Sequence, residues 1–478
     1  MSEQASSRIP LVRSAITFAA AAGLAVALSI FAPEGVPGWD FARLLLSLAL
    51  IVLLLRERMP VGPALLAGAL VMGLAFRLGP AALVGGFTFG LSEPGPGAAP
   101  TLLQKELVSF LVVAVMVTLI NVMGQALIAC RKVQQLVASL EHLTGDTRWV
   151  LAGVPAIIGL LPTPGGAVLS APMVGEVGDQ LRIGPAQKTL ANYWFRHVWE
   201  WWWPLFPAII IILTDGYISY GQILVYMGPF TILAILLGWF FILRPIPRPD
   251  RQKRDGGRAL QLRRLLGALW PVLLILGLFL LAQLPEMIVK WELPGMQLAE
   301  RIQPSEAVAQ WSLPASVLIV NVLLIGLSRE GRRHAGAIIR KGIQGRMVLL
   351  IYGVYALRAM LILTEGAERV SNGIAAFHLP ALAVLFLTPF AIAVITGYNL
   401  AGISMAFPLL AATLNRTGPA GVAVAFAGSF IGILGSPVHL CLVLTREYFH
   451  AEWLTIYRRL LPMLGFMTLL AILIGVFG

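Results

Sequence analysis

Charged side chains are scarce in this chain. Asp, Glu, Lys and Arg make up only 12% of its 478 residues, whereas soluble domains carry about 25%. Hydrophobic residues, in contrast, make up 58%. This composition excludes an ordinary soluble enzyme and places the chain among integral membrane proteins, whose partner is the lipid bilayer.

Cysteine is almost absent, and so are the motifs of common enzymes. Cys130 and Cys441 form neither a disulfide framework nor a paired CxxC motif, and we expect both to be small buried residues. HExxH, the P-loop and GxSxG in a strand-helix context are also missing. A metal held by His197, Glu200 and His439 is the remaining enzyme hypothesis, and it is a weak signal. The sequence predicts no enzyme, no cofactor and no resident metal.

Long apolar runs, rich in Leu, Ala, Ile and Val, replace the missing charge. Crossing a hydrocarbon core takes about 20 helical residues, and several runs reach this length: 14–32, 107–130, 223–243 and 265–282. Barrel strands would alternate over about 10 residues. We therefore predict an all-α polytopic membrane protein of roughly 11 spans. The first run exceeds the usual signal-peptide core of about 7–15 residues, which favours an uncleaved helix over a cleaved signal peptide.

The net charge of +12 is spread over short loops, so it indicates orientation and not nucleic-acid binding. Residues 244–264 hold eight basic and two acidic residues, and residues 329–346 hold six basic and one acidic residue. Both should be cytoplasmic. The loop at 285–311, with four glutamates and two basic residues, should lie outside. This scheme predicts a cytoplasmic N-terminus.

Two apolar stretches, 149–184 and 379–418, are interrupted by proline and glycine. Broken backbone at membrane depth is tolerated only where it is buried in protein or lines a cavity. We interpret both stretches as re-entrant helical hairpins. Each follows a full span, 105–130 or 347–364, and a short amphipathic segment, 133–143 or 367–377.

The two stretches align with each other at offsets that drift only from 237 to 233 residues. The aligned residues are Gly165 with Gly402, Pro172 with Pro408, Gly184 and Pro185 with Gly418 and Pro419, and Pro204 with Pro437. The charge pattern places one amphipathic segment inside and the other outside, so the repeats are inverted. The predicted regions are scaffold helices 1–104, repeat 1 at 105–243, a basic linker 244–264, scaffold helices 265–346 and repeat 2 at 347–478.

Inverted repeats with discontinuous helices are typical of secondary transporters, which bind their solute among half-helix ends near the midplane. Half-helix N-termini favour carboxylates and oxyanions. We therefore predict a secondary active transporter of a small anion, coupled to protons or sodium, that works by alternating access. An ion channel and a membrane scaffold without transport are the alternatives.

Polar residues at the breaks are the candidate site. Arg196 and Glu200 are four residues apart on one predicted helix face, so the arginine is expected to clamp an anion or to pair with the glutamate. His197, Glu200 and His439 are expected to carry the coupling proton or ion. Packing roles are the alternative for the histidines. The predicted substrate-binding residues are Thr163, Gly165, Gly166, Asn192, Arg196, Thr396, Asn399, Gly402, Ser404 and Ser436.

Two further features are open at this stage. Trp201 to Trp203 are expected either to wall a cavity or to face lipid. Asn121 and Arg358 match at an offset of 237 and are expected either to belong to the site or to join helices.

Three segments carry a family resemblance: LLPTPGGAVLSAPMV (160–174), NYWFRHVWEWWWPLFP (192–207) and GSPVHLCLVLTREYF (435–449). They resemble domain-of-unknown-function family 401, a family of prokaryotic membrane proteins that is similar to the ion transporter superfamily of citrate, gluconate, dicarboxylate and arsenite permeases. The resemblance implies a scaffold and a transport domain, hairpin tips that form the site, elevator-like motion and a homodimer. The resemblance therefore also implies a prokaryotic inner or plasma membrane. The Ser-Asn-Thr tip motifs of sodium-coupled dicarboxylate carriers are replaced by residues 162–166 and 396–399, so that coupling and that specificity are not carried over.

Overall fold

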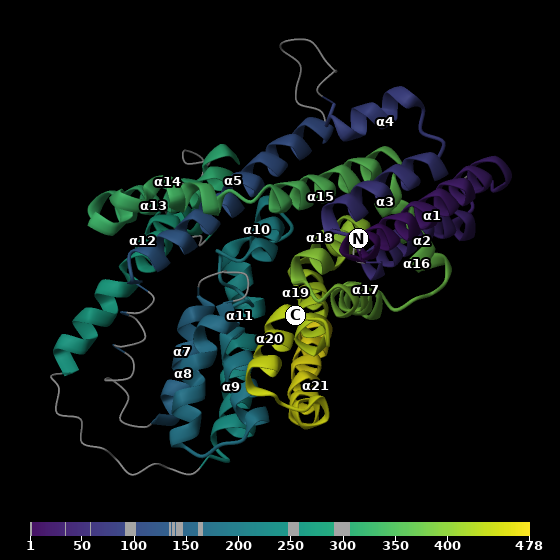
Figure 1. Cartoon of the computed structure of the whole chain (residues 1–478). Helices are drawn as coiled ribbons and strands as arrows, with labels where there is room; N and C mark the ends of the chain where they lie inside the picture. Colours follow the sequence, from purple (N-terminus) through teal and green to yellow (C-terminus); the bar gives the residue numbers. More distant parts are fainter. Residues whose placement is uncertain are drawn as a thin grey trace.

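The computed structural model describes residues 2–33, 35–57, 59–90, 102–132, 147–160, 166–246, 258–290 and 306–478, together with residues 135 and 139. Every regular element in these residues is a helix (Figure 1). A helix satisfies its own backbone hydrogen bonds, which is why long apolar runs in lipid fold this way. The predicted all-α fold is confirmed.

Eight helical segments in the described residues are long and apolar enough to cross a membrane, so the chain is a multi-pass membrane protein. They are Arg13–Phe31, Gly38–Arg56, Leu103–Ala129, Tyr220–Leu243, Gln261–Ala282, Gly345–Leu363, Ala411–Phe449 and Trp453–Phe477. Shorter apolar helices accompany them, among which are Val61–Ala75 and Trp311–Leu327. The full number of spans stays a prediction.

The N-terminal helices gather around α15 (Gly345–Leu363), on the upper side of Figure 1. They are α1 (Ser2–Phe31), α2 (Pro37–Arg56), α3 (Val61–Ala75), α4 (Pro80–Phe87) and α5 (Leu102–Ala129). Helix α3 packs against α1, α2 and α15, and α5 also packs against α15. The amphipathic helix α16 (Gly366–Ala376) joins this group because its Arg369 pairs with Asp40 of α2 at 2.7 Å.

A first set of broken helices follows α5, and its helices α7, α8 and α9 lie in the lower part of Figure 1. It comprises α7 (Thr147–Gly159), α8 (Gly166–Gln180), α9 (Pro185–Arg196), α10 (Pro207–Thr214) and α11 (Tyr220–Gly238), which continues as the π-helix η1 (Trp239–Leu243). Helix α7 packs against α8 and α9, so the predicted stretch 149–184 does form two adjacent helices. Its tip, residues 161–165, lies outside the described residues.

Three helices connect the first set to α15. They are α12 (Arg258–Lys290), α13 (Glu306–Leu327) and α14 (Arg329–Gly342). Helix α14 is rich in basic residues, begins after the N-cap Ser328 and packs on α5 and α13. Most of the basic linker, most of the loop at 285–311 and most of the segment 133–143 lie outside the described residues.

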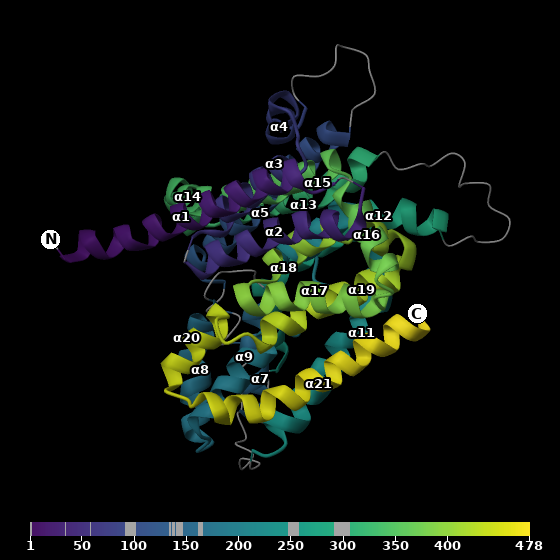
Figure 2. The same ribbon diagram turned by 90° about the vertical axis from the view of Figure 1, so that its right-hand side faces the viewer.

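A second set of broken helices ends the chain. It comprises α17 (Ala381–Thr396), α18 (Asn399–Leu409), α19 (Ala411–Gly435), α20 (Leu440–Phe449) and α21 (Trp453–Phe477). Helix α17 packs along α18 and α19, and α19 packs along α21. Figures 1 and 2 both place α20 beside α8 and α9, so the second set lies directly against the first.

Candidate functional site

The site is built from two helix breaks that belong to different sets. Helix α9 ends at Arg196, the chain runs through turns at 197–206, and α10 begins with Pro207 at its first position. Helix α19 ends at Gly435 and α20 begins at Leu440. Proline accounts for both interruptions, because it lacks the N–H that would continue a helix. Pro204 and Pro437, which the internal repeat aligns with each other, fall within these two segments.

The first break is wider than the sequence indicates, and this corrects one prediction. His197 and Glu200 are not on the helix of Arg196, because α9 ends at Arg196. The backbone hydrogen bonds that follow mostly join residues three apart instead of four: the Glu200 N–H, for example, donates to the His197 carbonyl. The argument that Arg196 and Glu200 share one helix face is therefore wrong. The two residues are still electrostatic neighbours, since the charge of Arg196 acts on Glu200.

Helix α9 is attached to the second break by side-chain hydrogen bonds. The Tyr193 hydroxyl donates to the Leu434 carbonyl at 2.9 Å, and the Asn192 amide donates to Thr445 Oγ1 at 3.1 Å. Both side chains are fully buried. These contacts hold the end of α9 against the end of α19 and against α20.

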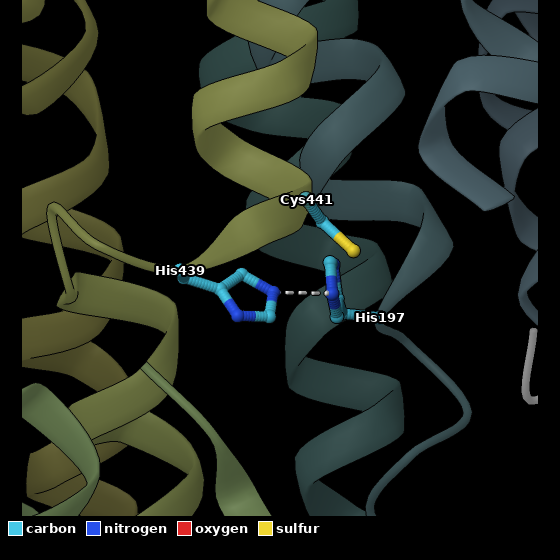
Figure 3. Close-up of side chains that lie close together, drawn as sticks. All are labelled: His197, His439 and Cys441. Carbon is cyan, nitrogen blue, oxygen red and sulfur yellow. Dashed lines mark hydrogen bonds between the residues drawn. The ribbon is translucent and has the colours of Figure 1, made fainter. Parts of the chain in front are cut away.

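His197 and His439 meet where the two breaks come together (Figure 3). Their Nε2 atoms lie 3.3 Å apart, although the residues are 242 positions apart in the chain. The two side chains are almost completely buried, with relative exposures of 3% and 7%. The structure thus brings together His197 and His439, which the sequence assigned to one coupling group; that role stays a prediction.

The other ring nitrogen of each histidine bonds to a backbone carbonyl. His197 Nδ1 lies 2.6 Å from the Tyr193 carbonyl, and His439 Nδ1 lies 2.9 Å from the Gly397 carbonyl. A carbonyl oxygen can only accept, so both Nδ1 atoms must carry the proton and donate it. In the neutral form of each ring, Nε2 then presents a lone pair.

Two more side chains complete this cluster. Cys441 is buried, and its sulfur lies with the two imidazoles such that the ligand atoms of all three residues are within 4.8 Å of one another (Figure 3). Glu200 Oε1 lies 3.7 Å from His197 Nε2. We refer to His197, Glu200, His439 and Cys441 as the break cluster.

The turn between α17 and α18, which we call the second tip, contacts the break cluster through its backbone. Gly397 separates α17 from α18 with a left-handed backbone (φ 65°), and a Cβ at this position would lie 2.9 Å from the Val438 carbonyl carbon. Only glycine allows both the conformation and the approach without strain. The N-termini of α18 and α20 are thus adjacent, and neither has a side-chain cap.

Most predicted polar residues of the second set bond within that set. Asn399 Oδ1 accepts from Ser429 at 2.7 Å, Ser436 donates to the Val394 carbonyl at 2.6 Å, and Ser404 donates to the Ala401 carbonyl at 3.4 Å. Thr396 accepts from the Tyr398 N–H at 3.3 Å. Gly402 lies against Ser429, where a Cβ would be 2.2 Å from its hydroxyl oxygen. These residues shape the tip and the break; direct contact with a solute stays a prediction for them.

The first tip is described only at its edge. Thr163 and Gly165 lie outside the described residues, and Gly166 begins α8. The last residue of α7, Gly159, contacts the first break so closely that a Cβ there would lie 2.0 Å from the Arg196 carbonyl oxygen. Arg196 itself is buried, with a relative exposure of 4%.

Two of the three consecutive tryptophans face the protein interior. Trp201 stacks on Phe230 with ring centroids 4.4 Å apart and meets the edge of Phe430 at 4.5 Å. Trp203 donates to the Leu160 carbonyl at 3.1 Å. Because Trp201 and Trp203 are buried, the lipid-facing interpretation fails for them.

A comparison with known protein families supports the resemblance seen in the sequence. The family of proteins of unknown function DUF401 matches residues 100–292 and 312–477. The chain belongs to this family. No curated protein matches the chain.

One solved structure with a similar fold is the crystal structure of the YdaH transporter of Alcanivorax borkumensis, which has an unusual topology. It is 18% identical to this chain, with a TM-score of 0.50, and the match covers 83% of this chain and 86% of the other. At this identity the likeness concerns the fold. It agrees with the polytopic helical architecture of the DUF401 chain.

A second buried polar group lies around Arg358, and of its members the sequence indicated only Arg358. Arg358 of α15 pairs with Glu106 of α5 at 2.9 Å and with Asp215, which caps α10. The Tyr355 hydroxyl also donates to Asp215 at 3.3 Å. The repeat offset matched Arg358 with Asn121, but its observed partners are these two carboxylates, which connect α15 to α5 and to the end of α10.

Proposed function

We propose that this chain is a secondary active transporter that moves a small anion across the membrane by alternating access. The observation that carries the proposal is the meeting of two helix breaks, one from each set, at a buried polar cluster. Unwound backbone and half-helix ends near the middle of a bundle are the usual solute site of secondary transporters. The similarity in fold to a solved transporter supports the same conclusion.

An anion is favoured by the charges around the breaks. The N-termini of α18 and α20 lie side by side without side-chain caps, and each contributes partial positive charge and unpaired N–H groups. Arg196 adds a full positive charge, which acts on His439 as well as on Glu200. We propose that the anion lies between Arg196, Asn192 and these two helix ends.

The inverted repeat supplies the transport cycle. In this proposal α7 and α8 form one re-entrant hairpin, α17 and α18 form the other, and the N-terminal helices around α15 act as the scaffold. Inverted repeats allow one site to open to opposite sides by exchanging the conformations of the two halves. The cytoplasmic N-terminus and the prokaryotic inner membrane belong to the same proposal.

Coupling to protons or sodium is supported by a count of buried charges. When both are ionised, Glu106 and Asp215 carry two negative charges against the single positive charge of Arg358. A net buried charge is costly in a membrane, and a bound proton or sodium ion would neutralise it. The earlier assignment of the coupling ion to His197, Glu200 and His439 stays a prediction.

The proposal is tested with purified protein. We expect one member of a panel of small organic and inorganic anions to raise the apparent stability of the detergent-solubilised protein by about 2.7 kcal/mol at 100 times its Kd. In liposomes the same anion should accumulate under a proton or sodium gradient, saturate and show counterflow. Flux without saturation or counterflow would indicate the channel alternative.

Variants of Arg196 make the test specific. Arg196→Ala should still fold, with a lowered melting temperature because a buried charged side chain is lost, and should lose anion binding, whereas Arg196→Lys, which keeps the charge, should retain weaker binding. If Arg196→Ala fails to fold while Arg196→Lys folds and binds as the wild type does, the arginine acts in packing and the anion assignment is wrong.

A further inference from the structure

The break cluster has the composition and the geometry of a transition-metal site. We infer that His197, His439 and Cys441 bind a Zn²⁺-class ion, with Glu200 as the fourth ligand. This inference deepens the proposed function, since it concerns the same breaks, but it rests on separate contacts.

The first step is the direction of the lone pairs. Both Nδ1 atoms donate to backbone carbonyls, so the Nε2 atoms of the neutral rings point at each other across 3.3 Å. Two lone pairs at this distance repel each other unless a cation lies between them. The backbone carbonyls that orient the rings are also the usual outer partners of metal-binding histidines.

The second step is the spacing. Zinc binds imidazole nitrogen at about 2.0–2.1 Å in tetrahedral sites, which places two nitrogens of one site about 3.3 Å apart. The observed distance between the two Nε2 atoms is 3.3 Å. The structure therefore already holds the two nitrogens at the edge length of a tetrahedral site.

The third step is the presence of sulfur. A proton shared by two imidazoles needs no third ligand, yet Cys441 Sγ and one ring nitrogen of each histidine all lie within 4.8 Å of one another. Thiolate and imidazole together favour soft and borderline ions such as Zn²⁺ over Na⁺, Mg²⁺ or Ca²⁺. Cys441 is in the first turn of α20, where the helix N-terminus stabilises a thiolate.

The fourth step is the charge balance. A divalent ion bound to one thiolate and one carboxylate is electrically neutral, so the completed site brings no net charge into the membrane interior. Glu200 Oε1, at 3.7 Å from His197 Nε2, is close to the spacing of a ligand pair in such a site. Small movements of the side chains of Glu200 and Cys441 would complete the coordination.

Cobalt is the probe that tests this inference without measuring transport. Co²⁺ added to the purified full chain in detergent should give the thiolate-to-cobalt charge-transfer band and the intense d-d bands of a tetrahedral site, and Zn²⁺ should displace it. Cys441→Ser should abolish the charge-transfer band. Cys130→Ser is the matched control, because Cys130 is also buried but its sulfur contacts the Leu324 carbonyl instead, and it should keep the full spectrum.

The histidines are tested in the same way. His439→Gln should weaken Co²⁺ binding by more than the 10- to 100-fold that loss of an outer partner causes. A wild-type protein that shows no Zn²⁺-sensitive tetrahedral spectrum, or a Cys441→Ser variant that keeps the charge-transfer band, would overturn the inference. Failure of anion transport with an intact cobalt spectrum would contradict the proposed function alone.

Discussion

At the scale of single residues, the buried ion pairs show how strongly one side chain depends on its neighbours. Arg358 holds two carboxylates from different helices, and the side chain of Asp215 is only 1% exposed. Removing one partner of a buried pair leaves an uncompensated charge, which costs about 3–5 kcal/mol. Replacing Arg358 should therefore cost more stability than replacing Glu106.

We predict that Arg358→Met lowers the free energy of unfolding by at least about 3–5 kcal/mol, because two carboxylates remain without a counter-charge. Glu106→Gln should have a much smaller effect, since it leaves one arginine with one aspartate. Thermal unfolding in detergent measures both. Equal losses for the two variants would show that the count of buried charges does not govern this group.

The same scale shows what sequence reasoning could not reach in the break cluster. Residues 197 and 200 and residues 439 and 441 lie in short local patterns, and neither pattern is a metal motif on its own. Their meeting depends on how α9 packs against α20, which is tertiary information. Arg358 was noticed for its depth in an apolar run, but Glu106 and Asp215 come from other helices, so its partners could not be identified.

At the scale of elements, the helix ends were largely predictable and the contacts between elements were not. The prolines and the glycine at 204, 397 and 437 indicated breaks because they remove donors or permit a left-handed backbone. The same residues say nothing about which breaks are adjacent. The turns after Arg196 were also missed, because the apolar pattern continues through His197 to Trp203.

Among the helix boundaries, Gly397, between α17 and α18, has the clearest consequence for stability. We predict that Gly397→Ala destabilises the protein by about 1–2 kcal/mol from its left-handed backbone alone, and by more because the new methyl meets Val438. Gly228→Ala in α11 is the control, because a Cβ there has no neighbour within 4 Å, and it should be neutral or slightly stabilising. Chemical or thermal unfolding curves measure both.

Co²⁺ binding is a second measurement of the effect of Gly397→Ala. Because the Gly397 carbonyl orients His439, Gly397→Ala should also weaken Co²⁺ binding, whereas Gly228→Ala should leave it unchanged. A Gly397→Ala protein with wild-type stability and wild-type cobalt binding would show that the tip and the second break are not mechanically joined.

At the scale of the whole molecule, the composition and the apolar runs were sufficient for the class of fold. The all-helical, multi-pass architecture follows from the length of the runs, and the described helices agree with it. Orientation in the membrane is a separate question that depends on loop charge. Those loops are mostly outside the described residues, so orientation is stated as a prediction.

We predict that single cysteines placed in the loop 244–264 are protected from an impermeant thiol reagent in intact cells, and that those placed at 285–311 are labelled. The native cysteines should not interfere, because Cys130 and Cys441 are only 8% and 9% exposed. Labelling after permeabilisation serves as the control for reactivity. The reverse pattern would invert the proposed topology.

The distance in sequence between His197 and His439 also constrains how the protein is made. The partner of His197 is 242 residues further along the chain, and at synthesis rates of about 5–20 residues per second it emerges roughly 12–48 s later. During that interval the first set of helices must enter the membrane with its histidine, its glutamate and its arginine unmatched by the second set. A nascent chain that stops before α20 therefore carries half a polar site in lipid, which marks it for the quality-control proteases that remove incomplete membrane proteins.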